Sequence, residues 1–393
     1  MPIQPSSTWK LSALAVAVAV SLAACGGGDD DNPLDLTSVK VIGDSLSDSG
    51  TFAGLPGGSR IASVQGSANE PNVLWVERVA QSYELAPLCP VYKYNGTTFV
   101  PNTQPGCTNY AIGGARINNP AGSGGAAAPL SVLRQLQDAA ARGWSDKDLV
   151  LIDGGGNDAA DLVGAYLGAA ADQGAAYVAL LGTLLPAETL QQALAAPGGR
   201  EAAGGLYMRA LADSLSAATR AQALDKGAKQ VVLANIPTIT FTPRFQFVLD
   251  QVAQASGGGA NGAAARAQAE ALVKGWVNAF NQRLAANFAG ESRVKVFDLA
   301  ATFTDQMNNP GKYGLSNVTL PVCGAAWVTA VPLRSFGDCT ASALSATPPP
   351  AGAPAGTGWW QRYLFSDGFH PSPYGHQLFG DSVIDLLRDA GWL

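Results

Sequence analysis

Residues 148–153, DLVLID, form the stretch that decides the fold, because they are an almost unbroken apolar run. Three segments have the same character: SVKVIG at 38–43, QVVLA at 230–234 and RVKVFD at 293–298. Strands that are apolar along their whole length are buried on both faces, which is typical of parallel sheets covered by helices. These runs therefore predict a buried parallel sheet, and we expect a fifth strand at 108–112.

Between these runs lie stretches rich in alanine and leucine, around residues 129–142, 206–228 and 263–288, whose composition is helical. Strands that alternate with helices predict a doubly wound α/β domain, in which ligands bind at the carboxyl ends of the strands. We expect one domain over residues 37–393, decorated by long insertions.

The composition excludes several classes of protein. Of the 393 residues, 47% are hydrophobic and 14% are charged, and the formal net charge is −6. The charged share is far below the ~25% of typical soluble domains, so the chain is not a disordered, solvated one. A negative net charge without a run of Lys or Arg argues against nucleic acid as a partner. With only two histidines, His370 and His376, we expect no metal site and no cofactor.

Residues 1–24 have the pattern of a secretory signal peptide. Lys10 precedes an apolar run over 11–24, which is shorter than the roughly 20 residues of a membrane-spanning helix. The run ends in small residues, as signal peptides do.

The sequence Leu-Ala-Ala-Cys at residues 22–25 resembles the cleavage box of bacterial lipoproteins. The resemblance implies that Cys25 is lipidated and becomes the new N-terminus, followed by a flexible acidic tether over residues 25–36. Because no Asp follows the cysteine directly, it also implies an exported protein anchored in the outer membrane. Ordinary cleavage that leaves a free thiol is the alternative.

Export makes disulfides available to the four remaining cysteines. Four cysteines allow three pairings, of which we favour the two that are local in the sequence, Cys89–Cys107 and Cys323–Cys339. Each closed loop would stabilise the fold by about 3 kcal/mol in the chain-entropy model. Zinc is the other use of four cysteines, but no pair has CxxC spacing.

Four short segments hold the residues that could carry chemistry: GDSLSD at 43–48, NYAIGGA at 109–115, GGGND at 154–158 and DGFHP at 367–371. The first three follow apolar strands, so we expect them at the edge of the sheet where such folds place their chemistry. Acyl transfer requires a nucleophile, a base, a group that orients the base, and donors for the oxyanion. The four segments hold one candidate for each.

Ser45 is the candidate nucleophile, expected where a strand turns into a helix so that its hydroxyl and its own N–H face a reacting oxygen. His370 is the candidate base, and Asp367, three residues earlier, can orient its ring and stabilise the imidazolium. Asn157 and Gly114 are candidate oxyanion donors, the first through its side-chain amide and the second through its backbone N–H.

Taken singly, each of these residues has an ordinary structural role, since serine caps helices, glycine and asparagine serve turns, and histidine can be a satisfied loop residue. Together, in this order and at strand ends, they favour catalysis. His376 is the alternative base, but no Asp stands three residues before it, so we interpret it as a helix or surface histidine. Trp359 and Trp360 could line an acyl groove, although packing is the interpretation we favour.

The four segments resemble the signature blocks of the SGNH hydrolases, also called GDSL esterases and lipases, and the similarity runs from about residue 39 to 376. This resemblance implies a flavodoxin-like three-layer α/β/α sandwich around a mostly parallel sheet of about five strands. It assigns the catalytic triad to Ser45, Asp367 and His370.

The same resemblance assigns the oxyanion hole to the Ser45 N–H, Gly114 and Asn157. Gly114, rather than its neighbour Gly113, takes the place of the family's glycine when counted from Asn109. The chain is longer than small members of the family, with the excess at about 160–290 and 300–360.

The resemblance implies a serine esterase or lipase that hydrolyses carboxylic esters through an acyl-enzyme. Acyl transfer to a sterol or other alcohol, removal of acetyl groups from polysaccharides, and a catalytically inert surface-binding lipoprotein are the alternatives. The expected partners are an ester substrate and the membrane that holds the lipid on Cys25, and we expect a monomer.

Overall fold

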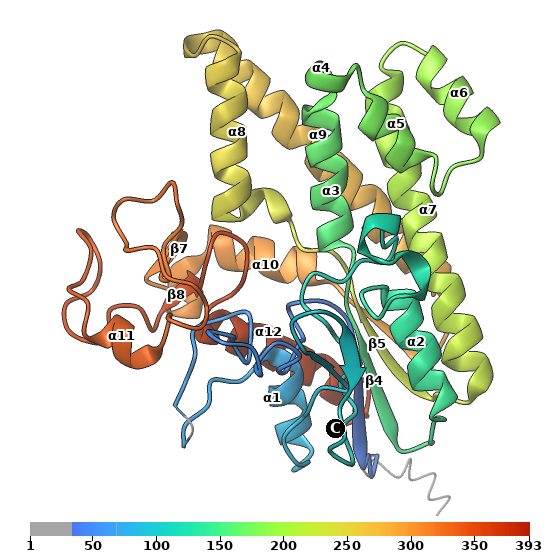
Figure 1. The fold of residues 1–393 in the computed structure, drawn as a ribbon, viewed down its shortest axis with the longest axis vertical. Coiled ribbons are helices and arrows are strands. Elements are labelled where there is room, and N and C mark those ends of the chain that lie inside the picture. The colour runs from blue at the N-terminus through green and yellow to red at the C-terminus, as the bar shows by residue number, and fades with distance from the viewer. Residues whose placement is uncertain (1–33, 68) are drawn as a thin grey trace, which may run out of the picture. The chain divides into compact units, whose positions relative to one another are not determined.

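The computed structural model describes residues 34–67 and 69–393, drawn as a ribbon in Figure 1. The expected leader, Cys25 and the tether up to residue 33 lie outside the described residues. The described strands are β1 (Ser38–Ile42), β2 (Tyr92–Tyr94), β3 (Phe99–Pro101), β4 (Asp148–Ile152), β5 (Gln230–Ala234), β6 (Val294–Phe297), β7 (Asn317–Pro321) and β8 (Tyr363–Phe365).

The described α-helices are α1 (Trp75–Ser82), α2 (Val132–Ala141), α3 (Gly156–Leu167), α4 (Ala169–Asp172), α5 (Ala175–Leu181), α6 (Ala187–Ala195), α7 (Gly199–Gln222), α8 (Pro243–Ala255), α9 (Gly259–Asn287), α10 (Leu299–Asn308), α11 (Ala341–Ser345) and α12 (Pro373–Asp389). Short 3-10 turns are η1 (Ala121–Ser123), η2 (Gly125–Ala127), η3 (Leu224–Lys226), η4 (Ile239–Phe241) and η5 (Pro310–Tyr313). None of the helices in residues 34–67 and 69–393 is both long enough and apolar enough to cross a bilayer.

The central sheet has the strand order β1-β4-β5-β6, with every neighbouring pair parallel. All four apolar runs are therefore confirmed as strands of one parallel sheet. The expected fifth strand at 108–112 was wrong as a full strand: within the described residues, Asn109 forms only isolated bridges, to Val41 on the open side of β1 and to Pro90. Backbone hydrogen bonds still hold residues 108–112 beside β1, and the chain turns just beyond them at Gly114, whose φ is +82°, so the pairing stays short. With this segment counted, the order is that of a flavodoxin-like sheet.

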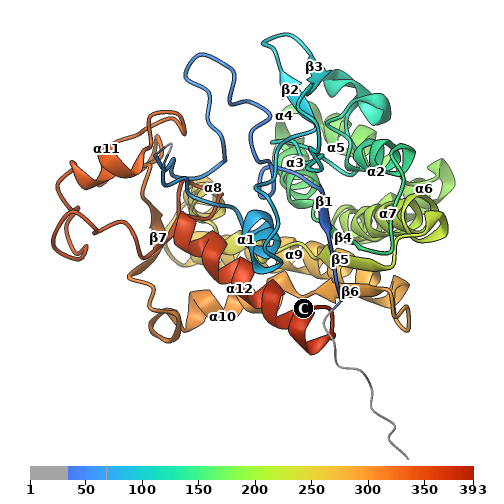
Figure 2. The same ribbon diagram turned by 90° about the horizontal axis from the view of Figure 1, so that it is seen from below.

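Helices cover both faces of the sheet. Alternate residues of a strand point to opposite faces, so Val150 and Ile152 pack on α2, α3, α7 and α9 while Leu149 and Leu151 pack on α1 and α12. Figure 2 shows the row of strands with α1 and α12 on one side and α2 and α7 on the other. The predicted three-layer α/β/α architecture is confirmed.

The extra length forms two additions to this sandwich. Between β4 and β6, helices α4 to α6 and α8 enlarge the helical layer around α3, α7 and α9, in the upper part of Figure 1. The chain reverses between α8 and α9 at Gly257 and Gly258, whose φ angles are +87° and +66°, values that favour glycine.

The second addition contains the small β7–β8 sheet and α11. Its core consists mainly of the Cys323–Cys339 disulfide with Trp359 and Trp360, which are 1% and 6% exposed. The tryptophans therefore pack, as favoured, instead of lining a groove. Both predicted disulfides, Cys89–Cys107 and Cys323–Cys339, are present.

Candidate active site

Ser45 lies in a tight turn directly after β1. The expectation that a helix begins here was wrong, because the first helix, α1, starts only at Trp75. The turn is closed by one backbone hydrogen bond from Ser47 N–H to the Asp44 carbonyl, 3.1 Å. Asp48 Oδ1 then accepts the backbone N–H groups of Gly50 and Thr51, at 2.9 and 2.8 Å, and the chain continues in turns and bends.

Ser45 meets His370 and Asp367 at the carboxyl end of the sheet. The distance from Ser45 Oγ to His370 Nε2 is 2.8 Å, although the two residues are 325 positions apart. The other ring nitrogen, Nδ1, lies 3.1 and 3.0 Å from the two carboxylate oxygens of Asp367. The backbone N–H groups of Phe369 and His370 also donate to Asp367 Oδ1, at 2.7 and 2.6 Å. These contacts fix the carboxylate and thereby the orientation of the ring.

The carboxylate also sets the protonation of the histidine. Burial disfavours the imidazolium, but the charge and hydrogen bond of Asp367 outweigh burial and raise the pKa of His370 above its ordinary value of 6.5. Burial would likewise raise the pKa of Asp367, yet the nearby imidazolium and the two backbone donors hold it below 3.8. The pair is thus arranged to stabilise a protonated ring behind an ionised carboxylate.

A buried carboxyl group that the sequence analysis missed, Asp153, holds the serine turn in place. Asp153 directly follows β4, and its Oδ1 accepts the Asp44 N–H at 2.9 Å while its Oδ2 accepts the Ser47 hydroxyl. Trp75 Nε1 donates to Ser47 Oγ at 3.0 Å and completes the chain of contacts. A Cβ at Gly43 would lie 2.3 Å from Asp153 Oδ1, so only glycine fits beside this carboxyl.

Asp153 differs electrostatically from an ordinary aspartate. Burial, followed by the charge of the adjacent Asp44, raises the pKa of Asp153 well above 3.8. The sequence gives one signal for this role, an acidic residue at the end of an apolar strand. That signal does not distinguish a carboxyl group that positions other residues from one that takes part in catalysis.

Two backbone N–H groups next to the serine are available to an incoming oxygen. Within the described residues, the N–H groups of Ser45 and Gly114 donate to no protein acceptor. The N–H of Gly113, by contrast, is already used, because it donates to Asp48 Oδ2 at 2.8 Å. The geometry therefore favours Gly114 over Gly113 as an oxyanion donor, as the count from Asn109 suggested.

Asn157 comes from the first turn of α3, just after the glycine turn that ends β4. Its amide nitrogen donates to the Ala115 carbonyl at 3.0 Å and lies 3.4 Å from Asp44 Oδ2. Asn157 also lines the same cavity as His370. Gly155 permits the turn, because its φ of +97° favours glycine and a Cβ there would lie 2.8 Å from Ile236.

A cavity of about 380 Å³ opens beside Asp367 and His370. Its outer wall is the loop between Cys323 and Cys339, which contributes Phe336, whose ring meets His370 edge-on at 5.4 Å. Further apolar lining comes from Ala160, Ala325, Ala326, Trp327, Leu333 and Phe369. None of these wall residues was singled out from the sequence.

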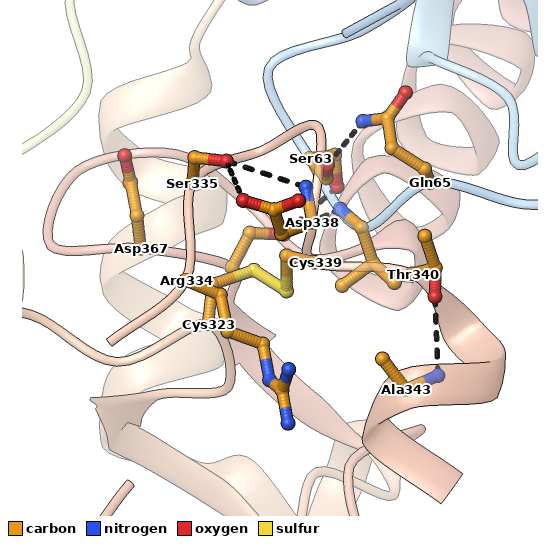
Figure 3. Close-up of a disulfide and its surroundings, with 12 residues drawn as sticks. Ser63, Gln65, Cys323, Arg334, Ser335, Asp338, Cys339, Thr340, Ala343 and Asp367 are labelled. Atoms are coloured by element: carbon orange, nitrogen blue, oxygen red, sulfur yellow. Dashed lines mark hydrogen bonds between the residues drawn. A yellow bond between two sulfur atoms is a disulfide. The ribbon is translucent and has the colours of Figure 1, made fainter. Parts of the chain in front are cut away.

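The Cys323–Cys339 disulfide, drawn in Figure 3, joins the two ends of this loop. The Cys323 N–H donates to the carbonyl of Ser366 at 2.7 Å, one residue before Asp367. On the other side, the Cys339 carbonyl accepts the Gln65 N–H at 2.8 Å. The wall and the catalytic carboxylate therefore share a hydrogen-bonded framework. The described residues contain no group of three His, Cys, Asp or Glu side chains that could hold a metal ion.

His376 is buried in α12 and makes no hydrogen bond to Ser45. The prediction that it lies in a helix is therefore confirmed, and the alternative that it lies on the surface was wrong. Its side chain is 0% exposed, and neither ring nitrogen has a hydrogen-bond partner among the described residues. Burial, and to a lesser extent the positive charge of His370, lowers the pKa of His376 to about 3. This residue is therefore neutral in the folded protein.

Replacing His376 with leucine is expected to reduce the acid sensitivity of the fold. A histidine in the unfolded chain titrates near 6.5, whereas folded His376 stays neutral down to about 3, so unfolding takes up a proton below pH 6.5. The free energy of unfolding should then fall by on the order of 1–2 kcal/mol between pH 6.5 and 5. Urea denaturation across this range measures the slope, which His376→Leu should flatten. Ser256→Ala, an exposed substitution that leaves both histidines in place, is the control and should keep the wild-type slope. An unchanged slope in His376→Leu contradicts the assignment.

Comparison with known proteins places this chain among lipases and acylhydrolases. The family described as GDSL-like Lipase/Acylhydrolase matches residues 39–383, a span that includes all four segments. The lipase Lip_vut3 from a goat rumen metagenome is similar in structure, with 13% identity, coverage of 91% of this chain and 98% of that one, and a TM-score of 0.35. Phospholipase A1 from Streptomyces albidoflavus NA297 gives 14% identity, 89% and 99% coverage, and a TM-score of 0.38. Among curated proteins, no match was found.

Proposed function

The chain belongs to the GDSL-like lipase/acylhydrolase family, and we propose that it is a serine esterase that cleaves carboxylic esters through an acyl-enzyme. The observation that carries the proposal is the 2.8 Å contact between Ser45 Oγ and His370 Nε2, with Asp367 behind the ring at 3.0 Å. A hydroxyl, an imidazole and a carboxylate in this arrangement activate serine as a nucleophile.

The reaction begins when Ser45 Oγ attacks the ester carbonyl carbon and His370 Nε2 takes the hydroxyl proton. Asp367 stabilises the imidazolium that forms. The N–H groups of Ser45 and Gly114 and the amide of Asn157 donate to the oxyanion of the tetrahedral intermediate. Collapse of the intermediate breaks the ester bond, and His370 returns its proton to the departing alcohol. Water, which gives a proton to His370, then attacks the acyl carbon on Ser45. The second tetrahedral intermediate collapses, the bond to Ser45 Oγ breaks, and His370 returns the proton to Oγ as the acid leaves.

Labelling with a fluorophosphonate probe, together with hydrolysis of p-nitrophenyl butyrate, tests the proposal directly. We expect the wild-type chain to be labelled at Ser45 and to hydrolyse the ester, because both reactions require the activated hydroxyl. A chain that keeps the fold only for binding stays unlabelled, and that result overturns the proposal. Adding an alcohol acceptor shows whether the acyl group passes to water or to alcohol.

Asn157→Ala is expected to lower kcat for p-nitrophenyl butyrate by roughly 100–1000-fold, because one oxyanion donor is lost. Fluorophosphonate labelling should persist, since the contact between Ser45 and His370 does not involve Asn157. Asn278→Ala, on the exposed face of α9, is the matched control and should keep the wild-type rate. A wild-type kcat in Asn157→Ala removes this residue from the oxyanion hole.

We also propose that residues 1–24 are removed on export and that lipid on Cys25 anchors the protein in the outer membrane as a monomer. The cleavage box at residues 22–25 supports the anchor. The mass of the N-terminal peptide of the mature protein tests it, and an unmodified Cys25 contradicts it.

A further inference from the structure

We call the cavity beside Asp367 and His370 the catalytic cavity. A second cavity, of about 560 Å³, lies next to it and shares Trp327 with it. It opens between α8 and β7, the two elements that carry most of its lining. Its apolar lining residues are Phe241, Pro243, Phe247, Met307, Leu320, Trp327 and Val328. No step of the proposed reaction uses this second cavity.

Trp327 forms the boundary between the two cavities. Its ring stacks on Phe247 of α8, with centroids 4.8 Å apart and an interplanar angle of 19°. The ring also packs against Gly368, between Asp367 and His370, where a Cβ would lie 2.9 Å from the indole. Trp327 is therefore the wall that the two cavities share.

The charged groups in the lining of the second cavity are already paired. Asp250 lies 3.0 Å from Arg266, and Glu270 lies 3.3 Å from Arg266 and 2.8 Å from Lys274. These carboxylates are therefore not available to bind a charged or polar group of a substrate in the second cavity. The apolar lining and the paired charges together favour an uncharged hydrocarbon as the occupant.

We propose that the second cavity binds the distal part of the substrate's acyl chain and that Trp327 sets the chain length. The preferred substrates are then esters of medium-chain and long-chain fatty acids, which reach beyond the catalytic cavity. This inference rests on the proposed esterase function, because it extends the same site. Its physical basis is the burial of methylene groups, each of which is worth roughly a fourfold gain in affinity.

A p-nitrophenyl ester series from butyrate to decanoate, kept below the micelle concentration, tests the inference. We expect kcat/KM of the wild type to rise at least tenfold from butyrate to decanoate. Thr319→Trp places an indole in the second cavity from an exposed position on β7. It should abolish the gain for decanoate and leave butyrate unchanged. Thr357→Trp, exposed and outside both cavities, is the matched control and should keep the wild-type profile.

Trp327→Ala gives a second, independent readout. Butyrate loses an apolar wall of the catalytic cavity, whereas decanoate gains a wider passage, so the decanoate-to-butyrate ratio of kcat/KM should increase severalfold. Fluorophosphonate labelling at the wild-type rate shows that each variant keeps its catalytic geometry.

Two results overturn the inference in different ways. If the wild type hydrolyses butyrate but Thr319→Trp leaves the decanoate-to-butyrate ratio within twofold of its wild-type value, the second cavity does not hold the acyl chain and the esterase function stands. If the wild type neither hydrolyses any ester nor reacts with the fluorophosphonate, both proposals fail.

Discussion

Ser45→Ala is expected to lower kcat for p-nitrophenyl butyrate by about 10⁶-fold, the loss that follows when a serine nucleophile is removed. Without the hydroxyl, no acyl-enzyme can form, and only binding and the oxyanion donors remain to assist water. The fold should be unaffected, because the only side-chain hydrogen bond that Ser45 makes in the described residues is the one to His370. Single-turnover and steady-state assays with a detection limit below about one part in 10⁶ of the wild-type rate measure the effect.

Ser256→Ala, in the exposed turn between α8 and α9, is the control for this experiment and should retain full activity. The Ser45→Ala protein should also fail to react with a fluorophosphonate. Hydrolysis by Ser45→Ala at more than a hundredth of the wild-type rate would show that another group is the nucleophile.

Asp367→Asn is expected to lower kcat by roughly 10⁴-fold. The asparagine amide can donate to Nδ1, which places the ring proton on Nε2 and leaves His370 unable to accept the proton of Ser45. The backbone donors at Phe369 and His370 can still bind the remaining oxygen, so the segment should keep its conformation. The loss therefore reports on the ring's tautomer and charge.

The pH profile separates this effect from a general structural defect. Asp367 helps to raise the pKa of His370 above 6.5, so wild-type activity should fall on the acid side of a midpoint above 6.5. In Asp367→Asn, the negative charge is gone and the midpoint should move to lower pH. Asp385→Asn, exposed on α12, should keep both rate and profile. A wild-type midpoint in Asp367→Asn means that the carboxylate does not set the pKa of the base.

The central sheet could be predicted because each of its strands has a recognisable apolar pattern in its own few residues. Segments such as 148–153 and 230–234 are apolar at nearly every position, and burial on both faces demands that pattern. The segment at 108–112 misled the prediction, since its residues resemble a strand while its pairing is confined to isolated bridges at Asn109. How far a segment pairs with a neighbouring strand depends on where the chain turns next. The hydrophobicity of Gly113 and Gly114 does not indicate that turn.

The candidate triad could be located for a different reason: its residues stand in four short blocks that resemble a known family. The supports and walls of the site could not be located this way. Asp153 acts through the backbone of Asp44 and the hydroxyl of Ser47, and only the folded register of β1 beside β4 brings these groups together. Trp327 and Phe336 lie in an insertion without a periodic pattern, so tertiary structure alone places Phe336 against His370 and Trp327 against Gly368.

The separation of 325 positions between Ser45 and His370 has a consequence for the biosynthesis of the protein. The hydroxyl lies in the turn after β1, whereas the imidazole lies just before α12, so every nascent chain that ends before residue 370 lacks the proposed base. The proposed proton relay therefore cannot be completed before residue 370 has been added to the chain. Until the segment that carries His370 reaches the turn after β1, the growing polypeptide cannot activate Ser45 in the way that we propose.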